Sequence, residues 1–326
     1  MSNSGPTDAA RRTFLQAAPL CGAALIGSTA QSVLAAQTTN KGQQAGEEPA
    51  GDQRTMKTPV YEIYALRYAS KLERTRNENF IFDFDPHDGP MPMDYFVWLL
   101  KSNQHTILVD SGFNETSGKA RNRVLSCDPI RSLSVLGIDI SRIDDVIITH
   151  LHYDHAGNLA QLPKARLHIQ DAEMEYATGR YMRQRVLRGA YAADDVVEVV
   201  RGVYQERVVF HQGNDQVMPG VEVIHIGGHT RGLQSVRVFT QRGWVVLASD
   251  ATHYYDNMRL KNPFPIVFNT GDMISGYEAL VRAADSLDHI VPGHDPAVLR
   301  VYPRMSNAGV DVACLHLPPN PGSFKS

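Results

Sequence analysis

The alternation of apolar and polar residues predicts β-strands in both halves of the chain. In the first half, residues 60–70 alternate as a half-buried strand does, and the runs 94–102 and 105–112 indicate a pair of strands. Two short apolar runs, 143–150 and 165–170, predict further strands. The second half has four more such patterns, at 221–228, 233–240, 243–250 and 289–296.

Helical patterns lie between and after these strands. Residues 128–138 place Ile130, Leu133 and Leu136 three apart, which predicts a short helix. Longer helical patterns occur at 171–190, 193–205 and 275–287. Because strands dominate each half, with helices between and after them, we predict an α/β fold: a sandwich of two mixed sheets that face each other, with helices outside.

The first 36 residues differ from the rest of the chain. Arg11 and Arg12 precede a weakly apolar run rich in Ala, Gly and Ser, which ends near Ala36 with small residues that suit cleavage. This segment resembles a twin-arginine export signal, and it is too diluted by polar residues for a transmembrane anchor. A soluble amphipathic helix is the alternative, but Pro19 and the lack of charge after Arg12 argue against it. We therefore expect a periplasmic or secreted protein.

Two further segments follow the expected signal. Residues 37–58 are polar, rich in Gln, Gly and Glu, and predict a disordered linker. Residues 59–326 have the patterned sequence of one large domain. The whole chain of 326 residues is 43% hydrophobic and 21% charged, an ordinary globular composition. Its formal net charge of -3 argues against nucleic acid or an anionic membrane as partner, so we expect a small-molecule substrate.

Only two cysteines lie outside the expected signal, Cys127 and Cys314. Either they pair as a disulfide in the periplasm, or they stay as buried thiols. The sequence leaves both alternatives open.

The segment 144–158, DDVIITHLHYDHAGN, carries the strongest chemical signal. A buried strand ends at Ile148, and the carboxyl ends of strands are where α/β sheets usually place their sites. His150 and His152 are two apart and would point the same way, while Asp154 and His155 turn toward a neighbouring point. Imidazole and carboxylate are ligands of first-row divalent metals, so this loop would serve two adjacent ions. A polar loop that is rich in His by chance is the alternative, and the spacing makes it improbable.

One loop cannot complete two metal sites, so other strand ends must contribute. His229 follows an apolar strand and two glycines, Asp250 directly follows another strand, and His294 follows a third through a Pro-Gly turn. Each taken alone would equally serve as a capping residue or a satisfied core group. Together with the 144–158 loop they repeat one arrangement, an apolar strand followed by a ligand, four times.

The motifs HLHYDH, GGHTRG, ASD and PGHD resemble the metallo-β-lactamase superfamily, and within it most closely the N-acyl homoserine lactonase group. The resemblance extends from about Val60 to the C-terminus and includes ILVDSGF, which is similar to the family's strand and turn before the metal motif. It implies an αββα sandwich for a hydrolase domain over residues 59–326, and two divalent metal ions, most naturally Zn²⁺.

The resemblance also assigns the ligands. It implies one ion on His150, His152 and His229, and the other on Asp154, His155 and His294. Asp250 would bridge the two ions. Asp110 matches a carboxylate that orients a ligand by a hydrogen bond, although a role in stabilising its own turn is equally open.

The implied reaction is hydrolysis of an ester bond. Two ions about 3.5–4 Å apart hold a water and lower its pKa toward about 7, so that a metal-bridging hydroxide attacks the carbonyl. Asp154 would take part in proton transfer to the leaving alkoxide. The implied enzyme is a lactonase that opens N-acyl homoserine lactones, a quorum-quenching activity, into hydroxy acids. Hydrolysis of phosphotriesters or other carboxylic esters by the same fold is the alternative.

One position departs from the lactonase pattern. Lactonases of this kind carry a tyrosine three residues after the bridging aspartate, and here that position is His253, with Tyr254 next to it. Either side chain would supply a hydrogen-bond donor to the substrate as a catalytic residue. The alternative is that these rings only pack the loop.

Three segments would surround the site. The runs 86–98 and 260–272 are apolar and would hold an acyl chain, or else form core or a homodimer contact. A helical insert over 181–204 and its arginines would cap the site, or they form a solvated face. The expected partner is a small lactone or ester, with no nucleic acid and no stable membrane anchor after signal removal.

Rival functions fit less well. A true β-lactamase generally lacks a bridging aspartate at the position of Asp250. A glutathione thioester hydrolase should have a basic C-terminal part, and here only Lys325 is basic among the last residues. A non-catalytic metal-binding protein would not need the full ligand set.

Overall fold

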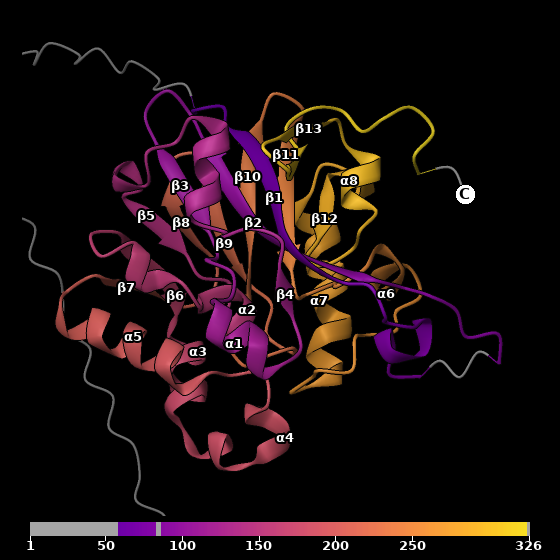
Figure 1. Ribbon diagram of the computed structural model, residues 1–326, viewed down its shortest axis with the longest axis horizontal. Helices are drawn as coiled ribbons and strands as arrows, with labels where there is room; N and C mark the ends of the chain where they lie inside the picture. The colour runs from indigo at the N-terminus through magenta and orange to yellow at the C-terminus, as the bar shows by residue number, and fades with distance from the viewer. Residues whose placement is uncertain (1–57, 83–85, 325–326) are drawn as a thin grey trace, which may run out of the picture. The chain divides into compact units, whose positions relative to one another are not determined.

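The computed structural model describes residues 58–82 and 86–324, which form two β-sheets packed face to face (Figure 1). The expected export signal and all but the last residue of the expected linker lie outside the described residues. Within the described part of the chain, no helix has both the length and the apolar character needed to cross a membrane.

The larger sheet is mixed. Its strands run in the order β13 (Arg304–Asn307), β14 (Val310–Cys314), β1 (Glu62–Lys71), β2 (Met93–Lys101), β3 (Thr106–Val109), β5 (Asp145–Ile147), β6 (Arg166–Gln170) and β7 (Val208–His211), and β4 (Val124–Leu125) pairs with β1. Neighbours from β13 to β3 are antiparallel, and those from β3 to β7 are parallel. The parallel part brings the carboxyl ends of β3 and β5 to one edge.

The smaller sheet is also mixed. Its order is β12 (Ile290–Pro292), β11 (Gly243–Ser249), β10 (Gln234–Thr240), β9 (Val221–His225) and β8 (Asp215–Met218). β10 is antiparallel to both β9 and β11, and β12 is parallel to β11. The three strands β9, β11 and β12 therefore run in the same direction.

Alternation along the strands divides the apolar residues into three layers. In β2, Phe96 and Trp98 enter the core between the two sheets, whereas Val97 and Leu99 face the outer side of the larger sheet. β11 divides in the same way between the central core and the outer side of the smaller sheet. This period of two, on both sheets, is what makes a four-layer sandwich possible.

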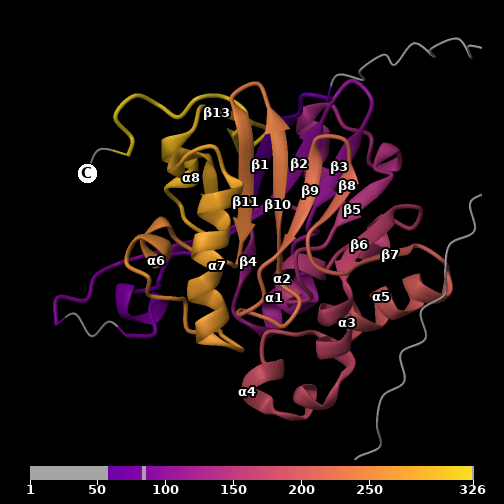
Figure 2. The same cartoon turned by 180° about the vertical axis from the view of Figure 1, so that it is seen from behind.

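Helices cover both outer faces. On the larger sheet, α3 (Asp171–Thr178) and α5 (Ala193–Tyr204) pack beside β6 and β7, and on the smaller sheet α7 (Thr270–Ala283) packs through Tyr277 and Leu280 (Figure 2). The shorter helices are α1 (Glu115–Ala120), α2 (Tyr153–Ala156), α4 (Arg185–Arg188), α6 (Tyr255–Arg259) and α8 (Val298–Val301). Single 3-10 turns occur at Arg76–Asn79, Arg131–Leu136, Ile140–Arg142, Leu159–Gln161, Arg180–Arg183 and Leu287–His289.

The predicted sandwich of two mixed sheets with outer helices is confirmed, and each predicted strand is present. Five strands were not predicted: β4, β7, β8, β13 and β14. Three of these are edge strands, and β13 has only exposed side chains, so they lack the apolar alternation that reveals a half-buried strand.

Two helical predictions differ from the structure in detail. The predicted helix at 128–138 is a 3-10 turn, which ends at Gly137 in a left-handed conformation with φ +71°. The predicted helix at 171–190 is broken into α3, a 3-10 turn and α4. A Cβ at Gly179 would lie 2.4 Å from the carbonyl oxygen of Glu175, so the chain passes this point only as glycine.

The two cysteines are unpaired. Cys314 is buried opposite Tyr64 in the β1–β14 pair, while Cys127 is partly buried with its Sγ 3.8 Å from the carbonyl oxygen of Arg67. Of the two alternatives, a disulfide or two thiols, the structure has two thiols.

Candidate metal centre

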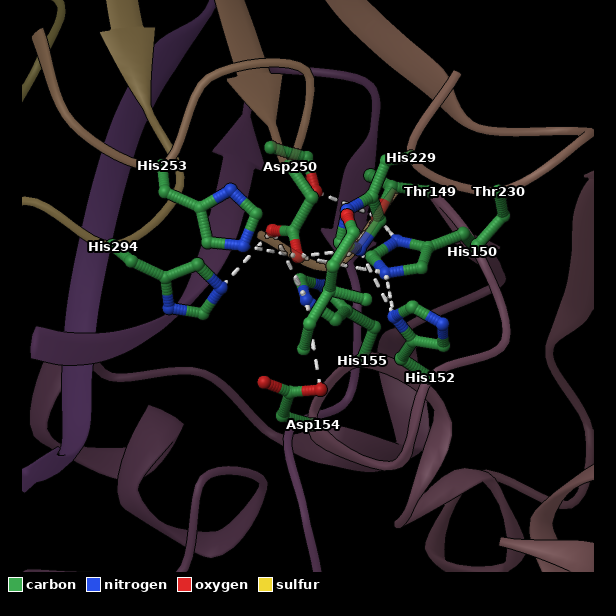
Figure 3. Close-up of polar contacts among 12 residues, drawn as sticks. Thr149, His150, His152, Asp154, His155, His229, Thr230, Asp250, His253 and His294 are labelled. Atoms are coloured by element: carbon green, nitrogen blue, oxygen red, sulfur yellow. Dashed lines mark hydrogen bonds and ion pairs between the residues drawn. The ribbon is translucent and has the colours of Figure 1, made fainter. Parts of the chain in front are cut away.

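The predicted ligands meet where the two sheets present their strand ends. β3 and β5 are parallel and end next to each other, and β9, β11 and β12 share one direction, so all five carboxyl ends point toward the same region. Figure 3 shows the side chains converging there from these separate loops. The arrangement follows the general rule that α/β sheets build sites at the carboxyl ends of strands.

One group of ligand atoms comes from His150, His152 and His229. The Nε2 atoms of His150 and His229 each lie 3.0 Å from Nδ1 of His152 (Figure 3). All three rings are buried. With Asp250 they form a set of four side chains whose ligand atoms are close enough for one metal ion.

A second group comes from Asp154, His155 and His294, which also lie within reach of one ion. The Nε2 of His155 is 3.9 Å from Oδ1 of Asp154. Both histidines are buried, but the carboxylate of Asp154 is 12% exposed and lines a cavity beside the cluster.

Asp250 stands between the two groups. Its Oδ2 lies 3.0 Å from Nε2 of His229 and 3.6 Å from Nε2 of His150. Its Oδ1 lies 3.3 Å from Nε2 of His155 and 3.0 Å from Nε2 of His294. Each carboxylate oxygen therefore faces a different group of histidines.

Hydrogen bonds on the far side of each ring fix its direction. Nδ1 of His229 donates to the carbonyl oxygen of Ile266 at 2.7 Å, and Nδ1 of His294 donates to that of Asp94 at 2.8 Å. In both rings Nε2 is left facing the cluster. Such outer hydrogen bonds select the tautomer of a metal-binding histidine.

Asp110 orients a third ring. Its Oδ2 accepts a hydrogen bond from Nδ1 of His155 at 2.7 Å, and its Oδ1 accepts one from the backbone N–H of Thr149 at 2.7 Å. Of the two roles considered for this carboxylate, orienting a ligand is the one that these hydrogen bonds support, since both partners lie in the loop after β5 rather than in the turn of Asp110 itself. Asp110 itself has φ +59°, a conformation that non-glycine residues seldom adopt.

Burial and neighbouring charges set the ionisation of the cluster. Burial, with the neighbouring imidazoles, lowers the pKa of His150 and His152 well below the ordinary value, so both rings are neutral at pH 7. Burial alone would raise the pKa of Asp250, but the histidines around it hold that pKa well below its usual range. Neutral imidazole and ionised carboxylate are the forms that bind metal.

The described residues fit a divalent cation. The Nε2 of His155 and the Oδ1 of Asp250 are buried and have no hydrogen-bond partner in the described part of the chain. Around His152, three imidazole nitrogens converge, although neutral rings carry only one N–H each. A cation satisfies these lone pairs, and nitrogen with oxygen is a donor set that suits first-row divalent metals.

His253 belongs to the cluster, and Tyr254 does not. The Nε2 of His253 lies 3.1 Å from Oδ2 of Asp250, its ring stacks on Phe264 with centroids 3.8 Å apart, and burial lowers its pKa to about 3. The hydroxyl of Tyr254 instead donates to the carbonyl oxygen of Pro92 at 3.2 Å. Tyr254 is buried and does not line the cavity.

A cavity of about 350 Å³ opens beside the cluster, bordered by Asp154, Asp250 and His253. Of the apolar residues in 86–98 and 260–272, those that line it are Met93, Tyr95, Phe264 and Ile266. The others are occupied elsewhere: Phe96 and Trp98 lie between the sheets, and Phe268 packs on Tyr176. The prediction of an apolar pocket wall therefore holds for part of each segment.

The helical insert over 181–204 touches the cavity only in the short stretch after α4. Gly189 and Ala190 line the cavity, and the ring of Tyr191 lies 4.6 Å from that of His152. The four arginines of the insert, which were considered as a cap, do not line the cavity. They are Arg180, Arg183, Arg185 and Arg188.

Sequence reasoning missed other residues near the centre. Arg74, Arg121 and Arg123 line the cavity, and the buried Glu173 joins the ligand loops. Arg121 and Arg123 flank Asn122 in a turn after α1, so the alternation of an extended strand does not mark them. Arg74 and Glu173 follow no strand-end pattern, and nothing in the sequence marks them.

Comparison with known proteins agrees with this geometry. The family model described as the metallo-beta-lactamase superfamily matches residues 91–294. This chain belongs to that superfamily. Among curated relatives of this superfamily member, an N-acyl homoserine lactonase of Bacillus sp is 28% identical over 191 residues, covering 53% of this chain and 70% of the lactonase. A probable metallo-hydrolase of Mycobacterium tuberculosis is 26% identical over 230 residues, covering 63% and 72%.

Solved structures share the fold of this superfamily member. A quorum-quenching N-acyl homoserine lactone lactonase superposes with a TM-score of 0.62 and 22% identity, covering 74% of this chain and 95% of the other. The hydrolase AbOPH superposes with a TM-score of 0.62 and 17% identity, covering 82% and 99%. The family, the relatives and the buried cluster identify a metal-dependent hydrolase, as the sequence predicted.

Proposed function

We propose that this hydrolase binds two divalent metal ions, as Zn²⁺, and opens lactone rings. N-acyl homoserine lactones are the first substrates to consider, because several relatives are named N-acyl homoserine lactonases. Quorum quenching would then be the role of the reaction.

The observation that carries the proposal is the position of Asp250. One oxygen of its carboxylate faces His150 and His229, and the other faces His155 and His294. A carboxylate that serves one ion needs histidines on one side only. Ligands on both sides support a bridge between two ions.

When bound, two such ions acidify a water molecule and polarise a carbonyl oxygen. The chain supplies the remaining steps. Asp154 lines the cavity and is partly exposed, so it is placed to pass a proton to the alkoxide that leaves as the ring opens. His253 lines the same cavity, and we assign to it, rather than to Tyr254, the place of the residue that meets the substrate.

The deciding experiment measures lactone opening in a pH-stat. Purified protein is loaded with Zn²⁺, its metal content is measured, and homoserine lactones of increasing acyl length are tested together with a phosphotriester. We expect about two ions per chain and turnover of lactones. Faster hydrolysis of the phosphotriester than of every lactone would support the alternative substrate class, and no turnover of any ester would reject the proposal.

Replacing the bridge tests the mechanism. We expect Asp250→Asn to lower lactone opening at least about 100-fold, because the amide cannot serve two cations as a carboxylate does. Metal content should fall in the same variant. Asp288→Asn changes an exposed carboxylate that does not line the cavity, so this variant is the matched control and should keep full activity. Undiminished activity of Asp250→Asn would contradict the mechanism.

A further inference from the structure

Three arginines, Arg74, Arg121 and Arg123, line the cavity beside the metal ligands. We propose that they form a binding site for an anionic group of the substrate, so that the enzyme prefers lactones and esters that carry a carboxylate near the scissile bond. This inference rests on the proposed function and adds a substrate class to it.

The arginines come from two neighbouring segments. Arg74 follows β1, and Arg121 and Arg123 lie between α1 and β4, which pairs with β1. They line the cavity together with Met93, Phe264 and Ile266, which supply apolar surface. A small cavity with cationic and apolar parts binds a ligand in one orientation.

Neutral groups hold the arginines in place. Arg121 donates to the carbonyl oxygen of Tyr191 at 3.0 Å and lies over the ring of Tyr153 at 4.2 Å. The Nε of Arg123 donates to the hydroxyl of Tyr95 at 2.8 Å. These contacts orient the guanidinium groups without cancelling their charge.

Arg74 is held in the same manner. It donates to the carbonyl oxygen of Glu78 and to the side chain of Asn79, and its guanidinium lies 4.7 Å from the centre of the Phe264 ring. The ring of Phe264 also stacks on His253. Arg74 is therefore connected through one ring to the residue that stands beside Asp250.

The positive charges have no ion-pair partner within residues 58–82 and 86–324. Arg67, by contrast, pairs with both Asp94 and Asp311. Two carboxylates act on these arginines without an ion pair: Asp154 acts on Arg123, and Asp195 acts on Arg121. Burial raises the pKa of Asp195 to about 7, so it is only partly ionised at neutral pH. Half-buried guanidinium groups without a direct ion pair are costly, and an arriving carboxylate offsets that cost.

A guanidinium group is well suited to bind a carboxylate. Its planar fork donates two parallel hydrogen bonds to a carboxylate, and it stays charged at every relevant pH. Arg74 Nη1, Arg121 Nε and Arg123 Nη2 carry no hydrogen bond to the described residues. These donors are available to a ligand.

A matched pair of lactones tests the preference. 5-Oxotetrahydrofuran-2-carboxylate and 5-oxotetrahydrofuran-2-carboxamide have the same ring and nearly the same size, and only the first is anionic. We expect kcat/KM for the carboxylate to exceed that for the carboxamide by about tenfold or more in the Zn²⁺-loaded enzyme, as charge-assisted hydrogen bonds would give.

Variants assign the preference to the arginines. Arg121→Gln and Arg123→Gln should each lower the ratio severalfold, and Arg123→Lys should restore part of it by returning the charge. Arg142→Gln removes an exposed arginine outside the cavity and should leave the ratio unchanged. The melting temperature and the metal content of each variant separate a lost anion site from a damaged fold.

Binding without turnover separates this inference from the proposed function. Tetrahydrofuran-2-carboxylate has no scissile bond, and its binding is compared by calorimetry with that of the corresponding carboxamide. Stronger binding of the anion in wild type, lost in Arg121→Gln or Arg123→Gln, supports the anion site even if no lactone is opened. Equal binding of the two compounds, or an anion preference that both Gln variants retain, overturns the inference while leaving lactone opening to stand on its own measurement.

Discussion

Asp110 shows how much a single buried side chain contributes at the residue scale. It is fully buried, and its carboxylate joins the turn after β3 to His155 in the loop after β5. Burial raises its pKa, although the hydrogen bonds from His155 and Thr149 oppose that shift. The residue is therefore needed for the direction of one imidazole rather than for contact with substrate.

We predict that Asp110→Asn weakens metal binding or activity by about 10-fold to 100-fold, because His155 loses its charged acceptor. Competition with a chelator and lactone turnover would measure the two effects. Asp139→Asn, in an exposed 3-10 turn cap, is the matched control and should change neither. Wild-type metal affinity and turnover in Asp110→Asn would contradict the assigned role.

Asp195 predicts a pH dependence of stability. Burial raises its pKa to about 7, above about 3.9 for an aspartate in the unfolded chain, so the native state binds the proton more tightly. Its contribution to the free energy of unfolding is therefore greatest below about pH 4 and declines as the pH rises toward 7. Above pH 7 the residue stays buried as a charge, and Arg121 offsets only part of the cost of burying it.

We predict that Asp195→Asn stabilises the protein relative to wild type increasingly from pH 5 to pH 8, by a few degrees of melting temperature at the upper end. The measurement is the difference in melting temperature between the two proteins at each pH, since other titrating groups cancel in that difference. Asp194→Asn, the exposed neighbour on the same helix turn, should give a difference with no such slope. A flat difference for Asp195→Asn would refute the shifted pKa.

At the scale of elements, α3 holds the ligand loops together through Glu173. Its Oε1 accepts hydrogen bonds from the backbone N–H of Leu151 at 2.9 Å and the hydroxyl of Tyr191 at 2.9 Å. Its Oε2 accepts from the hydroxyl of Thr230 at 2.6 Å and the N–H of Gly232 at 3.1 Å. One buried carboxylate thus connects the loop after β5, Tyr191 of the insert and the loop after β9.

We predict that Glu173→Gln loosens the set His150, His152 and His229, because an amide replaces one acceptor oxygen with a donor among four donors. Metal affinity measured by chelator competition should fall about 10-fold to 100-fold. Glu175→Gln changes an exposed residue of the same helix that pairs with Arg231, and it should have no effect. Equal metal affinity in the two variants would show that Glu173 supports only the fold.

The prediction that a ligand follows each of these apolar strands succeeded because it depends on local sequence. Strands β5, β9, β11 and β12 are apolar runs followed by short turns, so their ends could be located without the fold. Edge strands such as β13 could not, since their side chains are exposed and carry no apolar alternation. Glu173 was equally hidden, because its four partners lie in three other segments.

At the scale of the whole molecule, the two sheets bring ligands from separate halves of the chain to one point. His150 and His294 are far apart in sequence, yet each lies within 3.6 Å of Asp250. A site of this kind exists only in the folded protein, which suits export after folding. We therefore propose that residues 1–36 direct the folded hydrolase out of the cytoplasm by the twin-arginine route.

We predict that replacing both Arg11 and Arg12 with Lys leaves the protein in the cytoplasm, because the paired arginines are the defining feature of such a signal. Cell fractionation followed by detection of the full chain would locate it. Arg54→Lys, a basic residue outside the expected signal, is the control and should not change the location. Export of the double variant at the wild-type level would refute the route.

The sequence by itself determined the family, the sandwich of two mixed sheets and the order in which the candidate ligands occur. It could do so because a period of two and a ligand after each strand are local properties. The family resemblance had already implied how the ligands group around Asp250. Only the tertiary structure decided that His253 and not Tyr254 joins them, and that three arginines share their cavity. Those facts depend on distances between segments remote in sequence, which the packing of the two sheets sets and no local pattern records.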